Sequence, residues 1–287
     1  MTTPLKCSWS GVFPAATTQF STDLAVDLPA TCTVQSALVR DGVHGLVLLG
    51  TVGENNSLSA EEKRAVLKAA VGAVGGQVPL IAGVSELTTA NAAAYARDAE
   101  RIGVNGLMVL PAMVYVPTRA ELEYHLRTVA QATSLPVMLY NNPPAYRVNI
   151  EIESLERLAE LANVVALKES SPDPRRFTDV LNALGDRYIL FAGLDDFALR
   201  PWHSERAAGS RGSPTPSRSS RWRCMKPSAA GSWSAPARSI AGSCRSCTWI
   251  PSPTWCSPSS SRRPLWDGAP SACVHHGCRS PASAAPT

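Results

Sequence analysis

The sequence predicts an α/β fold, a (β/α)8 TIM barrel that is incomplete. Short apolar runs recur roughly every 25 to 30 residues, and helix-like segments lie between them. This alternation is typical of parallel strands joined by right-handed crossovers. No Gly-x-Gly-x-x-Gly motif follows any run, which argues against a dinucleotide-binding sheet. Seven strands are readable, one fewer than the eight that close a barrel.

The apolar runs lack polar alternation, which is the pattern of strands that are buried on both faces. In chain order, the expected strands are Gly11–Phe20, His44–Leu49, Pro79–Val84, Gly106–Pro111, Leu135–Tyr140, Val164–Lys168 and Tyr188–Ala192.

The segments between the runs have the apolar spacing of helices. The expected helices are Leu28–Asp41, Ser59–Val71, Thr88–Ile102, Arg119–Ala132, Ile150–Leu161 and Asp173–Leu184. Ser59 and Glu62 form a capping box at the start of the second helix, and we expect Gly72 to end it. Thr118 and Glu121 form the same motif before the fourth helix.

Composition divides the chain into residues 1–200 and residues 201–287. The second part holds 11 of the 27 Lys and Arg residues but only two acids, so its net charge is +9 while the whole chain carries +4. It also holds six of the eight Cys and six of the seven Trp residues. We therefore expect a barrel portion over 1–200 and an aberrant Ser/Pro/Arg-rich tail over 201–287.

The tail permits three interpretations. A basic, Ser/Pro-rich segment is ordinarily disordered or binds polyanions, but disordered segments are poor in Trp and Cys. A third interpretation is a shifted reading frame. When the reading frame is moved back by one nucleotide, the codons of Cys247–Pro251 permit Leu-His-Leu-Asp-Thr. The codons of Trp202–Arg206 then permit Leu-Ala-Leu-Gly-Ala. We expect the tail to be frameshifted and disordered. Because the barrel then cannot close, we expect the edges of the strands Gly11–Phe20 and Tyr188–Ala192 to be exposed and the chain to be poorly folded or inactive.

The first 200 residues predict a cytoplasmic protein without metal or membrane attachment. Residues 1–10 lack the basic start and apolar core of a signal peptide, and no apolar run has the roughly 20 residues that a membrane helix needs. Only Cys7 and Cys32 lie in this part, which gives no disulfide framework and no metal-ligand spacing.

Lys168 ends the buried run Val164–Leu167, and this position predicts chemistry. A lysine in an apolar environment tends to lose its proton, and a neutral amine can attack the carbonyl of a 2-oxo acid to form a Schiff base. The alternative is a lysine that leaves the sheet and extends into solvent. In a barrel, catalysis occurs at the carboxyl ends of the strands, where Thr51, Tyr140 and Gly193 also lie.

Four motifs in register resemble the dihydrodipicolinate synthase and N-acetylneuraminate lyase family of class I aldolases, over about residues 11–200. They are Gly50-Thr51-x-Gly53-Glu54, Tyr140-Asn141-x-Pro143, Lys168-Glu169 and Gly193-x-Asp195-Asp196.

The resemblance implies a lyase that uses no cofactor and acts on pyruvate or another 2-oxo acid. It implies that Lys168 forms the Schiff base, that Tyr140 shuttles protons and that Thr51 relays a proton or holds the carboxylate. It further implies substrate binding by Thr51, Val52, Gly53 and Gly193, and a homotetramer. The alternatives are that Tyr140 only plugs the barrel mouth and that Thr51 only forms a turn.

Departures from the family pattern bear on the substrate. Val52 stands where many relatives have a second hydroxyl residue. Lysine-pathway synthases have a second tyrosine that reaches a neighbouring subunit, and Tyr115 is the one candidate for it here. Ala145 replaces the arginine of those synthases, and Arg147 lies two residues further on. We therefore expect a catabolic aldolase, or a dehydratase or deaminase of a sugar-acid or hydroxyproline derivative. The alternatives are 4-hydroxy-tetrahydrodipicolinate synthase and an inactive remnant with a polyanion-binding tail, without specific nucleic-acid recognition.

Overall fold

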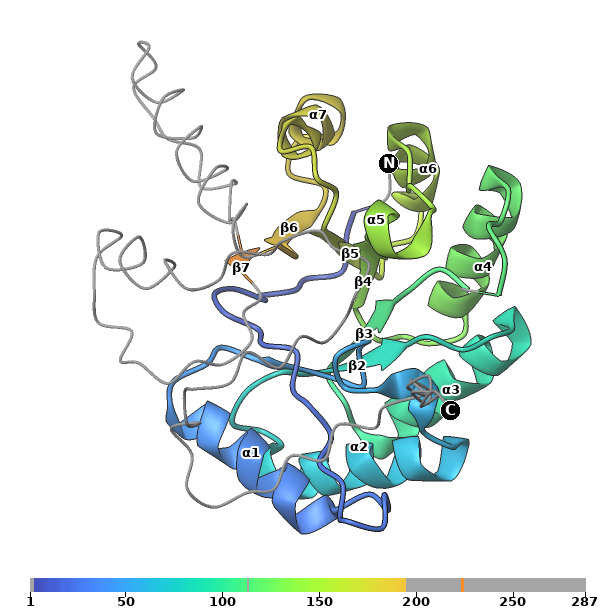
Figure 1. Cartoon of the computed structure of the whole chain (residues 1–287). Coiled ribbons are helices and arrows are strands. Elements are labelled where there is room, and N and C mark those ends of the chain that lie inside the picture. Colours follow the sequence, from blue (N-terminus) through green and yellow to red (C-terminus); the bar gives the residue numbers. More distant parts are fainter. Residues whose placement is uncertain (1–2, 113, 195–222, 225–287) are drawn as a thin grey trace, which may run out of the picture.

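The computed structural model describes residues 3–112, 114–194 and 223–224, and their main feature is one curved parallel sheet (Figure 1). The strands follow one another in chain order, and all six neighbouring pairs are parallel. They are β1 (Leu46–Leu48), β2 (Leu80–Val84), β3 (Gly106–Val109), β4 (Val137–Asn141), β5 (Val164–Glu169), β6 (Ile189–Ala192) and β7 (Arg223–Cys224).

Helices connect the strands and cover the outer, convex side of the sheet (Figure 1). They are α1 (Leu28–Arg40), α2 (Ala60–Val74), α3 (Thr89–Ile102), α4 (Arg119–Gln131), α5 (Pro143–Tyr146), α6 (Ile152–Leu158) and α7 (Arg175–Leu184), with a 3-10 turn at Asn55–Ser57. The predicted incomplete (β/α)8 barrel is confirmed: the strands and helices form a half-barrel that is open on one side.

Alternation along the strands divides the buried side chains into two clusters. The helix-side cluster contains, among others, Leu48, Leu139 and Leu167, and it joins the sheet to the helices. The lumen cluster fills the concave side and contains, among others, Val47 and Met138. Both clusters are almost fully excluded from solvent, as expected for a sheet buried on both faces.

The predicted strand Gly11–Phe20 is only partly formed. Ala15 makes a single parallel bridge to Val47, and Pro14, which has no N–H to donate, contributes only its carbonyl to the contact with β1. The segment instead fills the lumen: the Phe13 ring meets Phe191 of β6 edge-on, with centroids 5.4 Å apart. In Figure 1 this segment crosses the open side of the half-barrel between β6 and α1.

The predicted helix signals have mixed outcomes. The capping boxes at Ser59 and at Thr118 are both present, with each hydroxyl accepting from the backbone N–H three residues on. The prediction that Gly72 ends the second helix is wrong, because α2 continues to Val74, whose side chain is buried. A helical glycine with open space around it lowers stability by only about 1 kcal/mol, which the buried apolar face overrides.

The predicted free edge at the seventh expected strand is also wrong. Phe191 and Ala192 of β6 pair with Arg223 and Cys224, because any extended backbone can supply the hydrogen-bonding groups of a ladder. The remainder of the predicted tail, and the motif residues Asp195 and Asp196, lie outside the described residues, so the expectations for them stay predictions. In the described part, no helix is both long enough and apolar enough to cross a membrane.

Candidate active site

Lys168 and Tyr140 face each other in the lumen, where β5 and β4 end. They are direct partners in the parallel ladder, and they are 6% and 8% exposed. The Lys168 Nζ atom lies 4.3 Å from the centroid of the Tyr140 ring. The face of an aromatic ring is a favourable neighbour for a buried lysine side chain. The structure thus brings the predicted amine and phenol together and excludes a Lys168 side chain that extends into solvent.

A β-bulge at the start of β5 directs Lys168 into the lumen. The register between β4 and β5 shifts by one residue there, and two successive residues, Val165 and Ala166, both pack in the lumen cluster. Alternation then places Leu167 on the helix side and Lys168 in the lumen. Bulges commonly redirect side chains next to active sites, and without this one Lys168 would point toward the helices.

A second phenol, Tyr146, lies beside Tyr140. Its ring meets the Tyr140 ring edge-on, with centroids 5.6 Å apart and an interplanar angle of 84°. Its hydroxyl is 2.7 Å from Thr51 Oγ1, a hydrogen bond in which either oxygen can donate. Burial, and then the neighbouring Tyr140, raise the pKa of Tyr146, and the hydrogen bond to Thr51 opposes that rise.

Sequence reasoning missed Tyr146 because it missed α5, the four-residue helix that carries it. The signal was present: Asn142 followed by Pro143 is a favourable N-cap followed by the residue best suited to the first helical position. The Asn142 side chain accepts from Ala145 N at 3.3 Å and donates to the Tyr140 hydroxyl at 3.0 Å. Asn142 thus fixes both the short helix and the Tyr140 phenol.

The turn after β1 places Thr51 at the rim of the lumen. Gly53 is buried there, and a Cβ on it would lie only 2.9 to 3.0 Å from atoms of Leu49 and Ala16. Asn55 fixes the turn by donating to Leu49 O at 3.0 Å and to the β2 residue Gly83 at 3.1 Å.

Two backbone amides of this turn are available to a ligand. The N–H groups of Gly53 and Asn55 both bond to Gly50 O and close the turn. The N–H groups of Thr51 and Val52 bond to no residue that the structure describes, and both residues are exposed. Amides arranged in this way can hold an anion such as a carboxylate.

Gly193 provides the space that the Lys168 side chain occupies. A Cβ at this position would lie 3.0 Å from Lys168 Cε and 1.9 Å from Ser170 Oγ. Ser170 is 1% exposed, and its hydroxyl has no hydrogen-bond partner among the residues described. The predicted residue Gly193 therefore lies next to the amine, and the structure adds an unsatisfied hydroxyl beside it.

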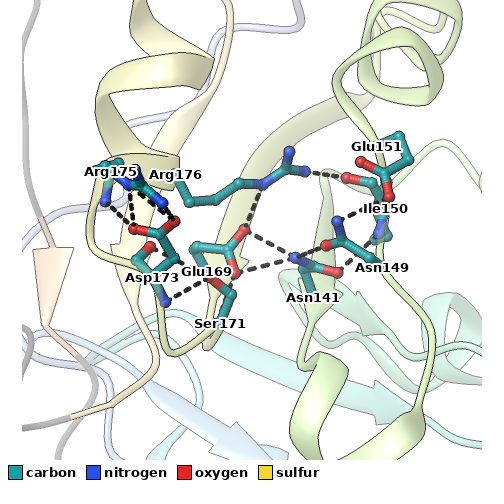
Figure 2. Close-up of polar contacts among 9 residues, drawn as sticks. All are labelled: Asn141, Asn149, Ile150, Glu151, Glu169, Ser171, Asp173, Arg175 and Arg176. Carbon is teal, nitrogen blue, oxygen red and sulfur yellow. Dashed lines mark hydrogen bonds and ion pairs between the residues drawn. The ribbon is translucent and has the colours of Figure 1, made fainter.

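A buried polar network lies on the opposite face of the sheet, at the same ends of β4 and β5 (Figure 2). Asn141 and Glu169 are ladder partners, and Asn141 Nδ2 donates to both carboxylate oxygens at 3.0 and 2.9 Å. Arg176 of α7 pairs with the same carboxylate at 3.3 Å and also donates to Ile150 O. The Ile150 amide in turn donates to Asn141 Oδ1 at 2.9 Å.

This network fixes the register of the strands that carry Lys168 and Tyr140. Burial raises the pKa of Glu169, while hydrogen bonds from Asn141 and the Ser171 amide, together with Arg176, oppose that rise. Figure 2 shows Asp173 and Arg175 paired at the start of α7. Arg175 Nη2 lies 2.7 Å from Asp173 Oδ2.

The other candidate residues lie away from the amine. Arg147 is exposed, with a left-handed backbone (φ 56°), at the end of α5. Tyr115 is 59% exposed, and its hydroxyl donates to Glu121 at 3.1 Å. Among the residues described, no three His, Cys, Asp or Glu side chains are grouped closely enough to hold a metal ion.

Fold and site together define a (β/α)-barrel protein with a buried lysine at the carboxyl ends of its strands. The sequence matches the dihydrodipicolinate synthetase family over residues 8–213, and the chain belongs to this family. The resemblance expected from the four motifs is therefore confirmed at the level of the family.

Individual relatives are consistent with this family assignment. The chain is 36% identical over 189 residues to a 4-hydroxy-tetrahydrodipicolinate synthase of Desulforamulus reducens, covering 66% of this chain and 64% of that protein. The crystal structure of dihydrodipicolinate synthase from Aquifex aeolicus is similar with a TM-score of 0.67 and 27% identity, over 76% of this chain and 70% of that one. The chloride-inhibited synthase from Acinetobacter baumannii, complexed with pyruvate, gives a TM-score of 0.63 and 27% identity, over 66% and 67% of the two chains. The chain thus spans less than two thirds of the length of the Desulforamulus relative.

Proposed function

We propose that this chain is a Schiff-base lyase that acts on pyruvate or another 2-oxo acid. The observation that carries the proposal is the Lys168 amine, 6% exposed and 4.3 Å from the Tyr140 ring centroid at the carboxyl ends of the strands. Burial disfavours the charged form of an amine, so a buried lysine can serve as a neutral nucleophile. The pyruvate complex of the Acinetobacter relative supports the choice of ligand.

In the proposed reaction, Lys168 Nζ attacks the keto carbon and water leaves, which gives a protonated imine. The imine accepts the electron pair of a C–H or C–C bond on the neighbouring carbon, which gives an enamine and releases a proton or an aldehyde. The enamine can add to a second carbonyl, or it can expel a hydroxyl or amino group from the next carbon as water or ammonia. Tyr140 moves the protons of these steps, and Thr51 relays them. The amides of Thr51 and Val52 bind the carboxylate, and Gly193, which binds substrate through its backbone, leaves the space that the Lys168 side chain needs.

The substrate that we propose is a catabolic 2-oxo acid derivative, such as a sugar acid or a hydroxyproline derivative that is cleaved, dehydrated or deaminated. Position 145 carries alanine and Arg147 faces solvent, so neither of these two positions of the described part places a guanidinium to bind a second carboxylate. A second candidate is 4-hydroxy-tetrahydrodipicolinate synthase, which is favoured by the name of the Desulforamulus relative. A cytoplasmic homo-oligomer is part of the same proposal.

Borohydride trapping tests the proposal. The full chain is incubated with pyruvate and borohydride, digested and mapped by mass spectrometry. We expect a reduced adduct on the peptide that contains Lys168, and none in Lys168→Met. An unmodified Lys168 peptide at saturating pyruvate would reject the Schiff-base mechanism. Comparison of sugar-acid and hydroxyproline derivatives with aspartate semialdehyde as second substrate separates the two candidate functions.

We further propose that residues 201–287 come from a shifted reading frame. Sequencing the gene across codons 199–202 tests this, and a single intact frame there would contradict it. The competing interpretation, a polyanion-binding tail with a net charge of +9, predicts salt-sensitive retention on heparin that disappears when 201–287 are removed.

A further inference from the structure

Leu49, the residue that follows β1, has a backbone conformation that few side chains adopt. Its φ is 53°, in the left-handed region that favours glycine, and its side chain is 1% exposed. Val47 packs in the lumen cluster and Leu48 in the helix-side cluster, so regular alternation would place the Leu49 side chain in the lumen. Leu49 instead joins Leu48 in the helix-side cluster. The left-handed conformation therefore keeps a leucine side chain out of the lumen, into which Lys168 projects.

The turn that Leu49 begins is tightly packed and strained. A Cβ on Gly83 of β2 would lie 2.2 Å from Leu49 O, and a Cβ on Gly53 would lie 2.9 Å from Leu49 N. Glu54, in the same turn, is also left-handed, with φ 59°. Left-handed conformations of residues other than glycine cost free energy, and they persist where surrounding contacts hold them. The turn thus needs a contact that holds it against this strain.

Asn55 supplies that contact. Its side chain is fully buried, and its Nδ2 atom donates to Leu49 O at 3.0 Å and to Gly83 O at 3.1 Å. The last ladder pair between β1 and β2 is Leu48 with Ala82, so the amide bridges the two strands one step beyond the end of their ladder. The reverse orientation of the amide would place its oxygen against two carbonyl oxygens, so only the nitrogen suits this position.

We propose that Asn55 is a positioning residue for the substrate carboxylate, a role that rests on the function proposed above. It acts through the turn that carries the Thr51 and Val52 amides. The Asn55 backbone N–H bonds to Gly50 O at 3.3 Å and its side chain bonds to Leu49 O, so Asn55 holds the two residues that precede these amides. Without these bonds, Leu49 relaxes toward an ordinary backbone conformation, which displaces both amides and turns the leucine side chain toward the lumen.

Borohydride trapping of the full chain over a range of pyruvate concentrations tests the proposal. We expect Asn55→Ala to raise the pyruvate concentration for half-maximal trapping about tenfold, because hydrogen bonds to a charged carboxylate contribute about this factor to affinity. The trapping rate at saturating pyruvate should remain close to that of the unmodified chain, because the amine and phenol belong to β5 and β4. A loss confined to affinity is the result expected of a residue that positions the carboxylate.

Asn163→Ala is the matched control. The Asn163 Nδ2 atom also donates to backbone carbonyls, at 2.8, 3.1 and 3.3 Å. Asn163 directly precedes β5, so these bonds lie at the amino ends of the strands, opposite the turn. We expect Asn163→Ala to lower the urea midpoint of unfolding without changing the half-maximal pyruvate concentration.

Glu54→Gly tests whether strain is what Asn55 opposes. Glycine adopts left-handed conformations without a steric cost, so this substitution makes the observed turn easier to hold. Combined with Asn55→Ala, it should return the half-maximal pyruvate concentration toward that of the unmodified chain. A general loss of packing at position 55 would not be restored in this way.

The outcomes distinguish the two proposals. If the unmodified chain traps no pyruvate, the proposed function and the role of Asn55 are both rejected. If it traps pyruvate and Asn55→Ala has the same half-maximal concentration, the role of Asn55 is rejected while the Schiff base stands. An equal rise in Asn163→Ala would also overturn this role, because the effect would then not be local to the turn. If Asn55→Ala lacks a cooperative urea transition, the same comparison in the Glu54→Gly background decides between these results.

Discussion

The two faces of the sheet at the ends of β4 and β5 contrast sharply. On the helix side, the Asn141–Glu169 pair is surrounded by donors from Arg176 and the backbone (Figure 2). On the lumen side, Tyr140 and Lys168 are buried beside aromatic rings and the Ser170 hydroxyl, which has no hydrogen-bond partner within the described ranges. A saturated polar network gives rigidity, whereas unsatisfied groups can bind something else. The same two strands thus have a structural face and, by the function proposed above, a reactive face.

The largest effect should come from breaking the structural face with Arg176→Leu. This substitution leaves the 2% exposed Glu169 carboxylate without its cation, and the loss of one partner of a buried pair lowers stability by about 3 kcal/mol. Urea unfolding of the full chain measures the change. Arg157→Leu is the control, since its pair with Glu123 is more exposed and should be worth about 1 kcal/mol or less. Equal losses in both variants would contradict the special role of the network.

Gly193→Ala should affect the reactive face more than stability. The added Cβ would displace Ser170 Oγ and crowd Lys168 Cε, which costs about 2 kcal/mol and moves the amine away from Tyr140. We expect borohydride trapping to slow about tenfold, since small displacements of reacting groups reduce rates strongly. Gly72→Ala on α2 has open space around it and should instead stabilise the chain slightly. Unchanged trapping in Gly193→Ala would contradict this account.

The pH dependence of the free energy of unfolding tests the structural face, because Glu169 titrates there. Because burial raises its pKa above the ordinary value of 4.5, the folded chain holds this proton more tightly than the unfolded chain. Its contribution to stability is complete below pH 4.5 and is lost as the pH rises through the raised pKa. Glu169→Gln should remove this decline in urea midpoints.

Glu123 provides a control of opposite sign for this measurement. Hydrogen bonding from Arg157 lowers the pKa of Glu123, so its contribution is lost as the pH falls instead. Glu123→Gln should therefore change the acid side of the stability profile. Identical profiles for Glu169→Gln and the unmodified chain would show that Glu169 is not perturbed as described.

The smallest effect concerns the rim of the lumen. Val52 is 55% exposed next to Thr51, and Val52→Thr adds a hydroxyl that can donate to a bound carboxylate. We expect the pyruvate concentration for half-maximal trapping to fall about fivefold, which corresponds to about 1 kcal/mol for one hydrogen bond. Val52→Ala, which adds no donor, should show no gain. Equal affinities for Val52→Thr and Val52→Ala would argue against carboxylate binding at this turn.

Sequence patterns predicted the parallel architecture well because local signals and tertiary packing agree there. The apolar runs at β1 to β6 and the capping boxes at Ser59 and Thr118 all occur as expected. The prediction from the sequence differed from the structure where tertiary packing overrides the local preference of the chain. Residues 11–20 read as a strand, but Phe13 is needed in the lumen and Pro14 interrupts the ladder.

The site was predictable only in part, for a related reason. Lys168 and Tyr140 each end an expected strand and Thr51 follows one, so the barrel topology alone brings them to one end. Tyr146 was missed because its position depends on a four-residue helix set by Asn142. The pairing of Glu169 with Asn141 depends on strand register, which no local pattern encodes.

The unpaired residue in β5 decides which of two neighbouring side chains faces the lumen. If β5 alternated regularly from Val164 onward, with Val165 paired to Met138, the carboxyl group of Glu169 would enter the lumen and the amine of Lys168 would meet a network built for an acid. The same sequence, with the same composition, would then present an acid where the bulged strand presents an amine.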